Sequence, residues 1–308
     1  LLGLPSLDYD VAVKTTDKFL MRIALEKSSL PIPWYVNLED PDLLDASQIP
    51  FYPCVSKPVD SSGSRGVRYI ESYEELLESV HYSFSKSRGR GVIIEEYMQG
   101  PEVSCEAIVV DKTPYIIQIT DKLTSGTPYF VEIRHNQPSL LSMEIIDAIK
   151  NVTCNTITAL GINHSAVHAE LIVTSEGPKI VEIGSRMGGG FLGTHLVPAS
   201  TGFDMTEAVI KIALGERIDV TLGDSRGAAI QFFTVKRSGI LQGISGLEAA
   251  GKVEGVLDLS LYAKIGDHVN VPQSGEDRLG HVISVADEPQ KAIEVCRSVV
   301  DCIHFIMD

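Results

Sequence analysis

The chain has 308 residues, of which 44% are hydrophobic and 22% charged, and its formal net charge is −15. This length allows a large core with two or three subdomains, and the acidic balance argues against a nucleic-acid or anionic-membrane surface. No apolar run approaches the length of a membrane span. The five cysteines are scattered, odd in number and without CxxC spacing, which favours reduced thiols and a cytoplasmic location.

The first part of the chain predicts short helices and strands. Thr15 or Thr16 can cap a helix over 17–27, because apolar residues recur on one side of that stretch. Ser72 can cap a second helix over 72–85. We also expect a short helix over 41–49 and strands over 54–59, 67–70 and 92–98.

The rest of the chain mixes longer helices with strands that follow one another. Residues 102–110 and 114–120 alternate like a hairpin, with Asp111-Lys112 at the turn. Gly215 is a C-cap for a helix over 203–214. We expect a loop-rich 123–137, a helix over 139–160, a β-rich region from 227 and a last helix over 289–305. Because strands are often neighbours, the pattern favours an α+β fold over a doubly wound sheet.

The stretch 167–190, VHAELIVTSEGPKIVEIGSRMGGG, predicts two strands, 168–173 and 179–183, joined by a turn. Side chains alternate along a strand, so Glu170 shares a face with His168 and Ile172. By the same rule Glu182 follows Ile180 on one face. An acid in a half-buried strand costs free energy unless it is paired, protonated or bound to a cation.

Two such acids on neighbouring strands indicate a phosphate site bridged by Mg²⁺. Arg186 and the Gly188-Gly189-Gly190 loop follow Glu170 and Glu182 and would complete it. The alternative is a hairpin with two salt-bridged surface acids.

A glycine-rich loop at 61–67 lies between two predicted strands, so it differs from phosphate loops that open a helix. A strand–loop–strand unit with Ser, Gly and Arg can fold over phosphates as a mobile lid. Lys57, on the preceding strand, would point at the same anion. The alternative is a surface hairpin.

The segment Glu95-Glu96-Tyr97-Met98, followed by Glu102, ends a predicted strand. The free backbone groups of a strand end suit the edge of an adenine, and a carboxylate a few residues on can accept from ribose hydroxyls. The alternative is a strand capped by solvated acids.

Glu132 and His135 lie in a predicted loop and are candidates for recognising an amine or another polar substrate group. The alternative for His135 is an exposed loop histidine. Asp121-Lys122 is interpreted as an ion pair on a loop. His164 and His168 have no partner spacing that would indicate zinc.

The order of these elements along nearly the whole chain resembles the ATP-grasp superfamily. The resemblance implies an α+β fold in which two subdomains clamp a nucleotide, with a β-rich C-terminal subdomain. It implies that Lys18 and Lys57 contact the nucleotide phosphates, under a mobile loop that includes Ser61, Ser62, Gly63 and Ser64.

The resemblance also implies the remaining ligand contacts. Glu95 would lie near the adenine amino group, Glu96 and Met98 would give main-chain contacts to adenine, and Glu102 would hold the ribose. Glu170 and Glu182 would carry Mg²⁺, with Mn²⁺ as a substitute, and Arg186 would stabilise the transferring phosphoryl group.

Within that superfamily the chain looks most like the L-amino-acid ligases, or dipeptide synthetases. By that similarity Glu132 and His135 contact the first amino acid, and Arg186 and Gly188 lie beside its carboxylate. The stretch from Gly239 through 266–267 to 277–280 also resembles the C-terminal region of this group.

Two departures accompany the resemblance. Many ATP-grasp enzymes place Asn two residues after the second metal carboxylate, where this chain has Gly184, so the number of Mg²⁺ ions stays open. The N-terminal α/β domain usual in these ligases is expected to be missing. We therefore divide the chain into a lead-in and helix over 1–30, a lid subdomain over 31–98, a central subdomain over 99–222 and a β-rich subdomain over 223–308.

These expectations predict an ATP-dependent ligase that joins a carboxylate to an amine through an acyl phosphate, acting on amino acids, with a homodimer as one assembly. The alternatives are a purine-pathway ligase of the glycinamide-ribonucleotide type, a carbamoyl-phosphate-synthase-like enzyme, and a nucleotide-binding protein without catalysis.

Overall fold

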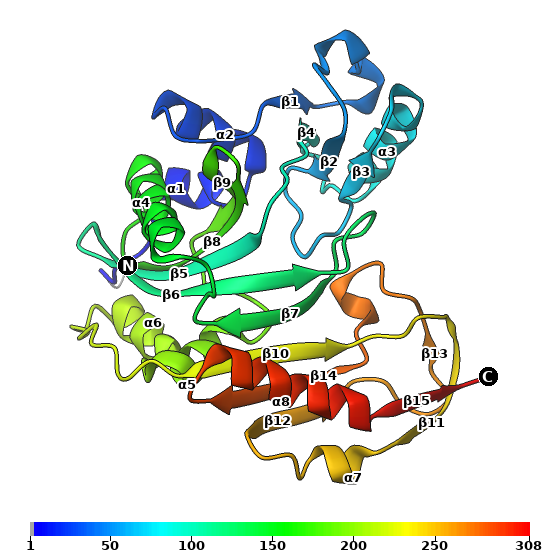
Figure 1. The fold of residues 1–308 in the computed structure, drawn as a ribbon. Coiled ribbons are helices and arrows are strands. Elements are labelled where there is room, and N and C mark those ends of the chain that lie inside the picture. The colour runs from blue at the N-terminus through cyan, green and yellow to red at the C-terminus, as the bar shows by residue number, and fades with distance from the viewer. Residues whose placement is uncertain (1–2) are drawn as a thin grey trace.

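The computed structural model describes residues 3–308, which form three sheets and the helices that cover them (Figure 1). The strands are β1 Tyr35–Leu38, β2 Cys54–Pro58, β3 Arg68–Ile70, β4 Val92–Glu96, β5 Glu102–Val110, β6 Thr113–Thr124, β7 Glu132–Gln137, β8 Ser165–Thr174, β9 Gly177–Gly184, β10 Gly227–Phe233, β11 Gly239–Ser245, β12 Val256–Leu261, β13 His268–Val269, β14 Gly280–Ala286 and β15 His304–Met307.

The helices alternate with these strands. The α-helices are α1 Tyr9–Lys14, α2 Lys18–Lys27, α3 Tyr73–Ser85, α4 Met143–Leu160, α5 Val197–Thr201, α6 Met205–Leu214, α7 Leu247–Ala250 and α8 Pro289–Cys302. Shorter turns of helix are η1 Pro41–Leu43, η2 Ala46–Gln48, the π-helical η3 Leu192–Leu196 and η4 Gly275–Asp277. Within the described part of the chain, no helix has the length and apolar character needed to cross a bilayer.

A small four-stranded sheet forms the lid unit. Its strand order is β1-β4-β2-β3, every neighbouring pair is antiparallel, and α3 packs on β2 and β3. The lid has a core of its own, in which Leu76 and Val80 of α3 meet Cys54, Ile70 and Ile94 of the strands. The loop between β2 and β3 extends from this unit toward the large sheet (Figure 1).

The large sheet has eight strands in the order β12-β14-β10-β7-β6-β5-β8-β9. Residues of α2 and α4 share one hydrophobic core with β5, β8 and β9, whereas α6 packs with Ile108, Ile117 and Ala166 in a different cluster. Helices therefore cover parts of both faces of the sheet.

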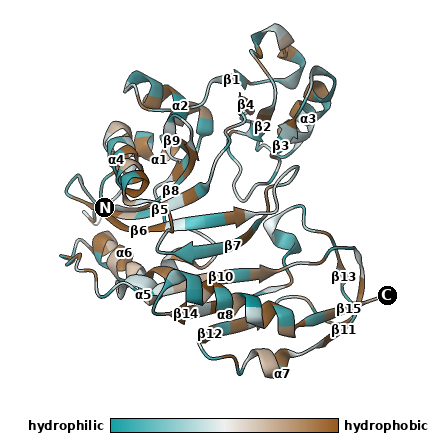
Figure 2. Cartoon of the chain, viewed as in Figure 1, coloured by the Kyte–Doolittle hydropathy of each residue, from teal (hydrophilic) through white to brown (hydrophobic). Residues whose placement is uncertain are grey.

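Strands of the C-terminal region extend the large sheet and then build a small one. Helix α8 packs on β10 and β14 through Ala292, Ile293, Cys296 and Val299. Figure 2 shows that α8 carries both hydrophilic and hydrophobic residues, as expected for a helix with one buried side. The three-stranded sheet β13-β11-β15 completes the chain.

The α+β expectation is confirmed, and so is the hairpin of β5 and β6, whose turn residues Asp111 and Lys112 both have positive φ. The helix over 17–27 exists as α2, but its cap is Asp17, whose side chain accepts from Leu20 N–H, rather than Thr15 or Thr16. Both threonine hydroxyls donate instead to carbonyls at the end of α1.

Three local predictions were wrong. The helix over 41–49 is two separate helical turns, each begun by an aspartate cap, Asp40 and Asp45. The loop-rich stretch 123–137 contains strand β7, which pairs with both β6 and β10. The last helix ends at Cys302, because the following residues pair with β11 as strand β15. The boundaries proposed for the subdomains stay a prediction.

Candidate nucleotide and metal site

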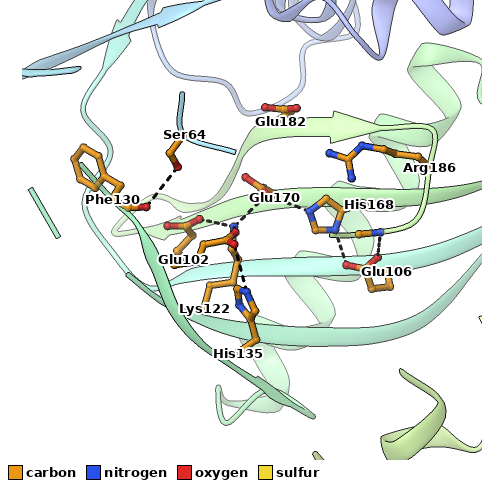
Figure 3. Close-up of polar contacts among 12 residues, drawn as sticks. Ser64, Glu102, Glu106, Lys122, Phe130, His135, His168, Glu170, Glu182 and Arg186 are labelled. Atoms are coloured by element: carbon orange, nitrogen blue, oxygen red, sulfur yellow. Dashed lines mark hydrogen bonds and ion pairs between the residues drawn. The ribbon is translucent and has the colours of Figure 1, made fainter. Parts of the chain in front are cut away.

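A cavity lies between the lid unit and the large sheet, and it collects most of the predicted site residues (Figure 3). The predicted residues that line it are Lys18, Lys57, Ser61, Ser62, Gly63, Ser64, Glu96, Met98, Glu102, Glu132, Glu170, Glu182 and Arg186. Among residues 3–308, its lining does not include the predicted Glu95, His135 and Gly188.

The two predicted metal carboxylates lie opposite each other on neighbouring strands. Glu170 of β8 and Glu182 of β9 are partners in the antiparallel register, whereas the next pair is Leu171 with Ile180. Val181 is therefore a β-bulge, an extra residue without a partner of its own.

The bulge changes which side chains face the cavity. Ile180 and Ile183 both lie in the hydrophobic core, while Val181 and Glu182 both line the cavity. The prediction that Glu182 shares a face with Ile180 was wrong, because the bulge interrupts the alternation between them. The prediction for the other strand is confirmed, since Glu170 and Ile172 both line the cavity.

Lys18, the first residue of α2, joins the glycine-rich loop 61–67 to Glu182, one of the two predicted metal carboxylates. Its Nζ donates to the Ser61 carbonyl at 2.6 Å and lies 2.9 Å from Glu182 Oε2. On the other side of the loop, Ser64 Oγ donates to the Phe130 carbonyl at 3.4 Å (Figure 3). The loop thus lies over the cavity and contacts groups on both of its sides.

Glu95 is the centre of a buried ion pair. Its carboxylate is 0% exposed, and it accepts from Arg22 Nε at 2.6 Å and from Lys57 Nζ at 2.7 Å. The Glu95 carboxylate faces these two cations beneath the cavity, so its position does not support the predicted contact with an adenine amino group. It instead holds Lys57, whose ammonium lines the cavity.

Arg22 was missed by sequence reasoning. Besides Glu95, its guanidinium donates to the carbonyls of Ile180 and Val181 at 2.8 and 2.9 Å. These carbonyls belong to the bulge in β9, where regular pairing is interrupted. One arginine therefore ties the lid strand β4 to the strand that carries Glu182.

The lowered pKa of Glu95 leads to a prediction of how stability depends on pH. Burial alone would raise the pKa of Glu95, but Arg22 and Lys57 lower it to about 2. A lowered folded-state pKa stabilises the protein above the unfolded value near 4, and this contribution disappears as the pH falls toward 2. We expect Glu95→Gln to be less stable than the wild type at neutral pH by about 3 kcal/mol, which is the linkage term alone. Urea unfolding between pH 7 and 3 should show the difference shrinking as the pH falls, and a constant difference would contradict this assignment.

Lys122 is a second residue that sequence reasoning missed, because it was interpreted as half of a loop ion pair. It lies in strand β6 with 2% of its side chain exposed. Its Nζ lies 2.8 Å from Glu102, 3.0 Å from Glu132 and 3.1 Å from Glu170 (Figure 3). One ammonium thus contacts the acids predicted to hold ribose, amino acid and metal.

These contacts determine the charge states of Lys122 and of the carboxylates around it. Burial alone would lower the pKa of Lys122, but the three carboxylates raise it well above its usual value. Burial would likewise raise the pKa of Glu170, and Lys122 and His168 lower it. The site therefore contains ionised carboxylates next to a permanent cation.

The predicted amino-acid contacts lie in strand β7 rather than in a loop. Glu132 Oε2 accepts from Arg278 Nη2 at 2.9 Å and lies 3.5 Å from His135 Nε2. Arg278, from the C-terminal region, also stacks on the Phe232 ring at 3.8 Å. His135 is 1% exposed, and neither ring nitrogen has a hydrogen-bond partner among residues 3–308. The ring does not line the cavity, so its contact with a substrate stays a prediction.

The predicted adenine end of the cavity is apolar and aromatic. Met98 and Tyr97 line it, and the Tyr97 ring packs edge-on against Tyr69 at 4.7 Å. Glu96 accepts from Lys179 Nζ at 3.4 Å, so its side chain is partly neutralised. The roles predicted for Glu96, Met98 and Glu102 stay predictions.

Arg186 packs over the glycine that replaces the expected metal-ligating asparagine. A Cβ added to Gly184 would lie 3.3 Å from Arg186 Cγ and 3.4 Å from its Nε. The Arg186 guanidinium donates to the Met187 carbonyl at 2.9 Å and lines the cavity. A side chain at position 184 would compete with Arg186 for this space.

The chemistry of the donors fits a hard divalent cation. Glu170 and Glu182 present register-paired carboxylates to one cavity, and Mg²⁺ binds through one or two carboxylates plus phosphate oxygens. Within residues 3–308, no cluster of three or more His, Cys, Asp or Glu side chains is arranged to hold a metal alone.

Family models match two parts of the chain. One model, described as an ATP-grasp domain, matches residues 50–195. Another, described as L-amino acid ligase C-terminal domain 2, matches residues 231–308. Residues 50–195 are therefore an ATP-grasp domain. The resemblance stated from the sequence is thereby confirmed, including the similarity of the C-terminal region to L-amino acid ligases.

Individual relatives agree with this family. The chain is 27% identical to dapdiamide A synthase of Enterobacter agglomerans, over 77% of its own length and 58% of that protein. It is 23% identical to an L-arginine-specific L-amino acid ligase of Bacillus subtilis, over 88% of its length and 67% of that protein. An L-amino acid ligase from Bacillus licheniformis has the same fold, with a TM-score of 0.88 at 24% identity, over 100% of this chain and 76% of that one.

The chain spans less than two thirds of some of these relatives. An uncharacterized protein of Sinorhizobium fredii is 28% identical over 98% of this chain, which covers 63% of that protein.

Proposed function

We propose that this protein is an ATP-dependent carboxylate–amine ligase that joins amino acids through an acyl-phosphate intermediate. The observation that carries the proposal is the pairing of Glu170 with Glu182 in the cavity that Lys57 and Arg186 also line. Two carboxylates can hold a cation against a phosphate, and two basic groups can bind the same anion. The match to the L-amino acid ligase C-terminal domain supports amino acids as the substrates.

In the proposed reaction a substrate carboxylate attacks the ATP γ-phosphate and releases ADP. Lys57, held in place by Glu95, and Arg186 would bind the phosphoryl group and oppose its negative charge. An amine then attacks the acyl phosphate, and the tetrahedral intermediate expels phosphate. The loop 61–67 would exclude water, which would otherwise hydrolyse the acyl phosphate.

Glu170 and Glu182 would hold Mg²⁺, or Mn²⁺ in its place, and the ion would neutralise phosphate charge when bound. Glu132 and His135 would contact the first amino acid. The Glu132 carboxylate is ionised, because Lys122 and His135 lower its pKa well below the usual value against the effect of burial. An ionised carboxylate suits the ammonium group of an amino acid.

Phosphate release from ATP and Mg²⁺ tests the proposal, with each standard amino acid supplied singly and then in pairs. We expect one or a few pairs to stimulate release, with a product of the matching condensed mass. Glu182→Gln serves as the inactive control, because it removes a proposed metal carboxylate and keeps the side-chain size. Tight ATP binding without stimulation by any pair would contradict the ligase proposal.

Tight ATP binding without stimulation by any amino-acid pair would favour a purine-pathway or carbamoyl-phosphate-synthase-like ligase, or a nucleotide-binding protein without catalysis. No specific contact favours one of these, and we keep the amino-acid ligase as the proposal. All five cysteines are unpaired thiols, which supports a cytoplasmic location. A homodimer stays a prediction.

A further inference from the structure

A buried pair of ionisable side chains lies beside the proposed metal carboxylates (Figure 3). Glu106 of β5 is 0% exposed and His168 of β8 is 5% exposed. His168 Nδ1 lies 2.5 Å from Glu106 Oε1, and His168 Nε2 lies 3.1 Å from Glu170 Oε1. The imidazole therefore lies between two carboxylates, one that faces the cavity and one that does not.

Glu106 also contacts a second loop, Gly188-Gly189-Gly190, which follows Arg186. The Gly188 N–H donates to Glu106 Oε2 at 3.2 Å. A Cβ added to Gly188 would lie 2.7 Å from His168 Nδ1 and 2.9 Å from Glu106 Oε1. The loop backbone therefore passes directly over the pair, and only glycine allows this approach without a shift.

Both contacts lead from the pair to groups that the proposed function uses. Through His168 the pair reaches Glu170, and through Glu106 it reaches the backbone of the loop beside Arg186. Among the described residues that line the cavity, neither Glu106 nor His168 is present. Their effect on a ligand must therefore pass through Glu170, which lines the cavity, or through the Gly188 backbone to the neighbouring Arg186, which also lines it.

On the basis of the proposed function, we propose that Glu106 and His168 act as one positioning pair that fixes Glu170 and the Gly188 backbone relative to each other. Carboxylate–imidazole partners behind a metal ligand commonly orient that ligand, and their removal costs roughly 10- to 100-fold in metal affinity. Here the same pair also anchors the loop whose Gly188 is predicted to lie beside the carboxylate of the amino acid. Metal binding and amino-acid binding would then share one support.

Calorimetry of ADP binding across a Mg²⁺ series tests the pair without measuring catalysis. Glu106→Gln, His168→Gln and the double variant are compared with the wild type. Each single variant should raise the Mg²⁺ concentration for half-maximal effect roughly 10- to 100-fold. ADP affinity without Mg²⁺ should stay unchanged. The double variant should be no worse than either single variant, because the two side chains act as a unit.

Two further variants provide a control and an independent test of the pair. Ser104→Ala is the matched control, because Ser104 is fully buried on β5 and its Oγ has no hydrogen-bond partner within residues 3–308. It should leave the Mg²⁺ dependence unchanged. Gly188→Ala keeps both members of the pair, but its added methyl group would displace them because it lies too close to both. It should therefore raise the Mg²⁺ concentration for half-maximal effect as Glu106→Gln does, and it tests the pair even if Glu106→Gln does not fold.

The outcomes separate this inference from the proposed function. Wild-type Mg²⁺ dependence in Glu106→Gln or Gly188→Ala, or additive effects in the double variant, would overturn the positioning pair alone. ADP binding that ignores Mg²⁺ in the wild type would overturn the proposed function and the pair with it.

Discussion

Glu182→Gln is expected to lower turnover in the proposed ligase reaction roughly 10²- to 10³-fold, which is the usual cost of losing one electrostatic group at a reacting centre. Glutamine keeps the size of the side chain and removes the charge that lies opposite Glu170 in the register. It also removes the anion 2.9 Å from Lys18 Nζ, which donates to the Ser61 carbonyl in the loop 61–67. Initial rates at saturating ATP and substrate measure the effect.

Glu176→Gln is a matched control in the turn of the same hairpin. Its side chain is 74% exposed and pairs only with Lys179 among the described residues. Exposed pairs of this kind contribute little, so this variant should turn over at close to the wild-type rate. Near-normal turnover in Glu182→Gln would show that the metal assignment is wrong.

Lys122→Met is expected to destabilise the protein by about 3–5 kcal/mol, because it removes one side of a buried ion-pair network. Methionine has a similar length and is apolar, so the packing of the stem is kept. Glu102, Glu132 and Glu170 would then lie close together with their shared ammonium gone. Urea unfolding at neutral pH measures the loss.

The pH dependence of this loss distinguishes charge from packing. Without Lys122 the pKa values of the neighbouring acids should rise in the folded state, so protonation relieves their repulsion. The deficit should therefore shrink as the pH falls from 7 to 5. Lys252→Met, at a lysine that is 72% exposed, should change stability by less than about 0.5 kcal/mol. A Lys122→Met protein as stable as the wild type would refute the network.

Local patterns in the sequence predicted the parts of the site that depend on neighbours along the chain. The hairpin of β8 and β9, its two acids and the loop at Ser61 were all found this way, and they lie around one cavity. Periodicity and turn residues carry this information because they act over a few positions. The roles of these residues stay predictions.

The partners of charged residues could not be predicted, because they come from distant segments. Arg22 lies 73 positions from Glu95, and Arg278 lies 146 positions from Glu132. Lys122 follows an aspartate in the sequence, which suggested a local ion pair, yet all three of its partners lie on other strands. Only the folded chain brings these charges together. A lysine at an alternating position of a strand is the one signal that could have been used.

The bulge at Val181 has a consequence for aligning and redesigning this chain. If Val181 were deleted, Ile180 and Glu182 would become successive residues of a regular strand and would keep their opposite faces. If β9 were instead regularised without a deletion, Glu182 would turn into the core and Ile183 into the cavity. A gap in an alignment is therefore harmless at position 181 and misleading at its neighbours. Grafting this site onto another sheet requires transferring the bulge residue Val181 together with Arg22, whose guanidinium donates to the Val181 carbonyl.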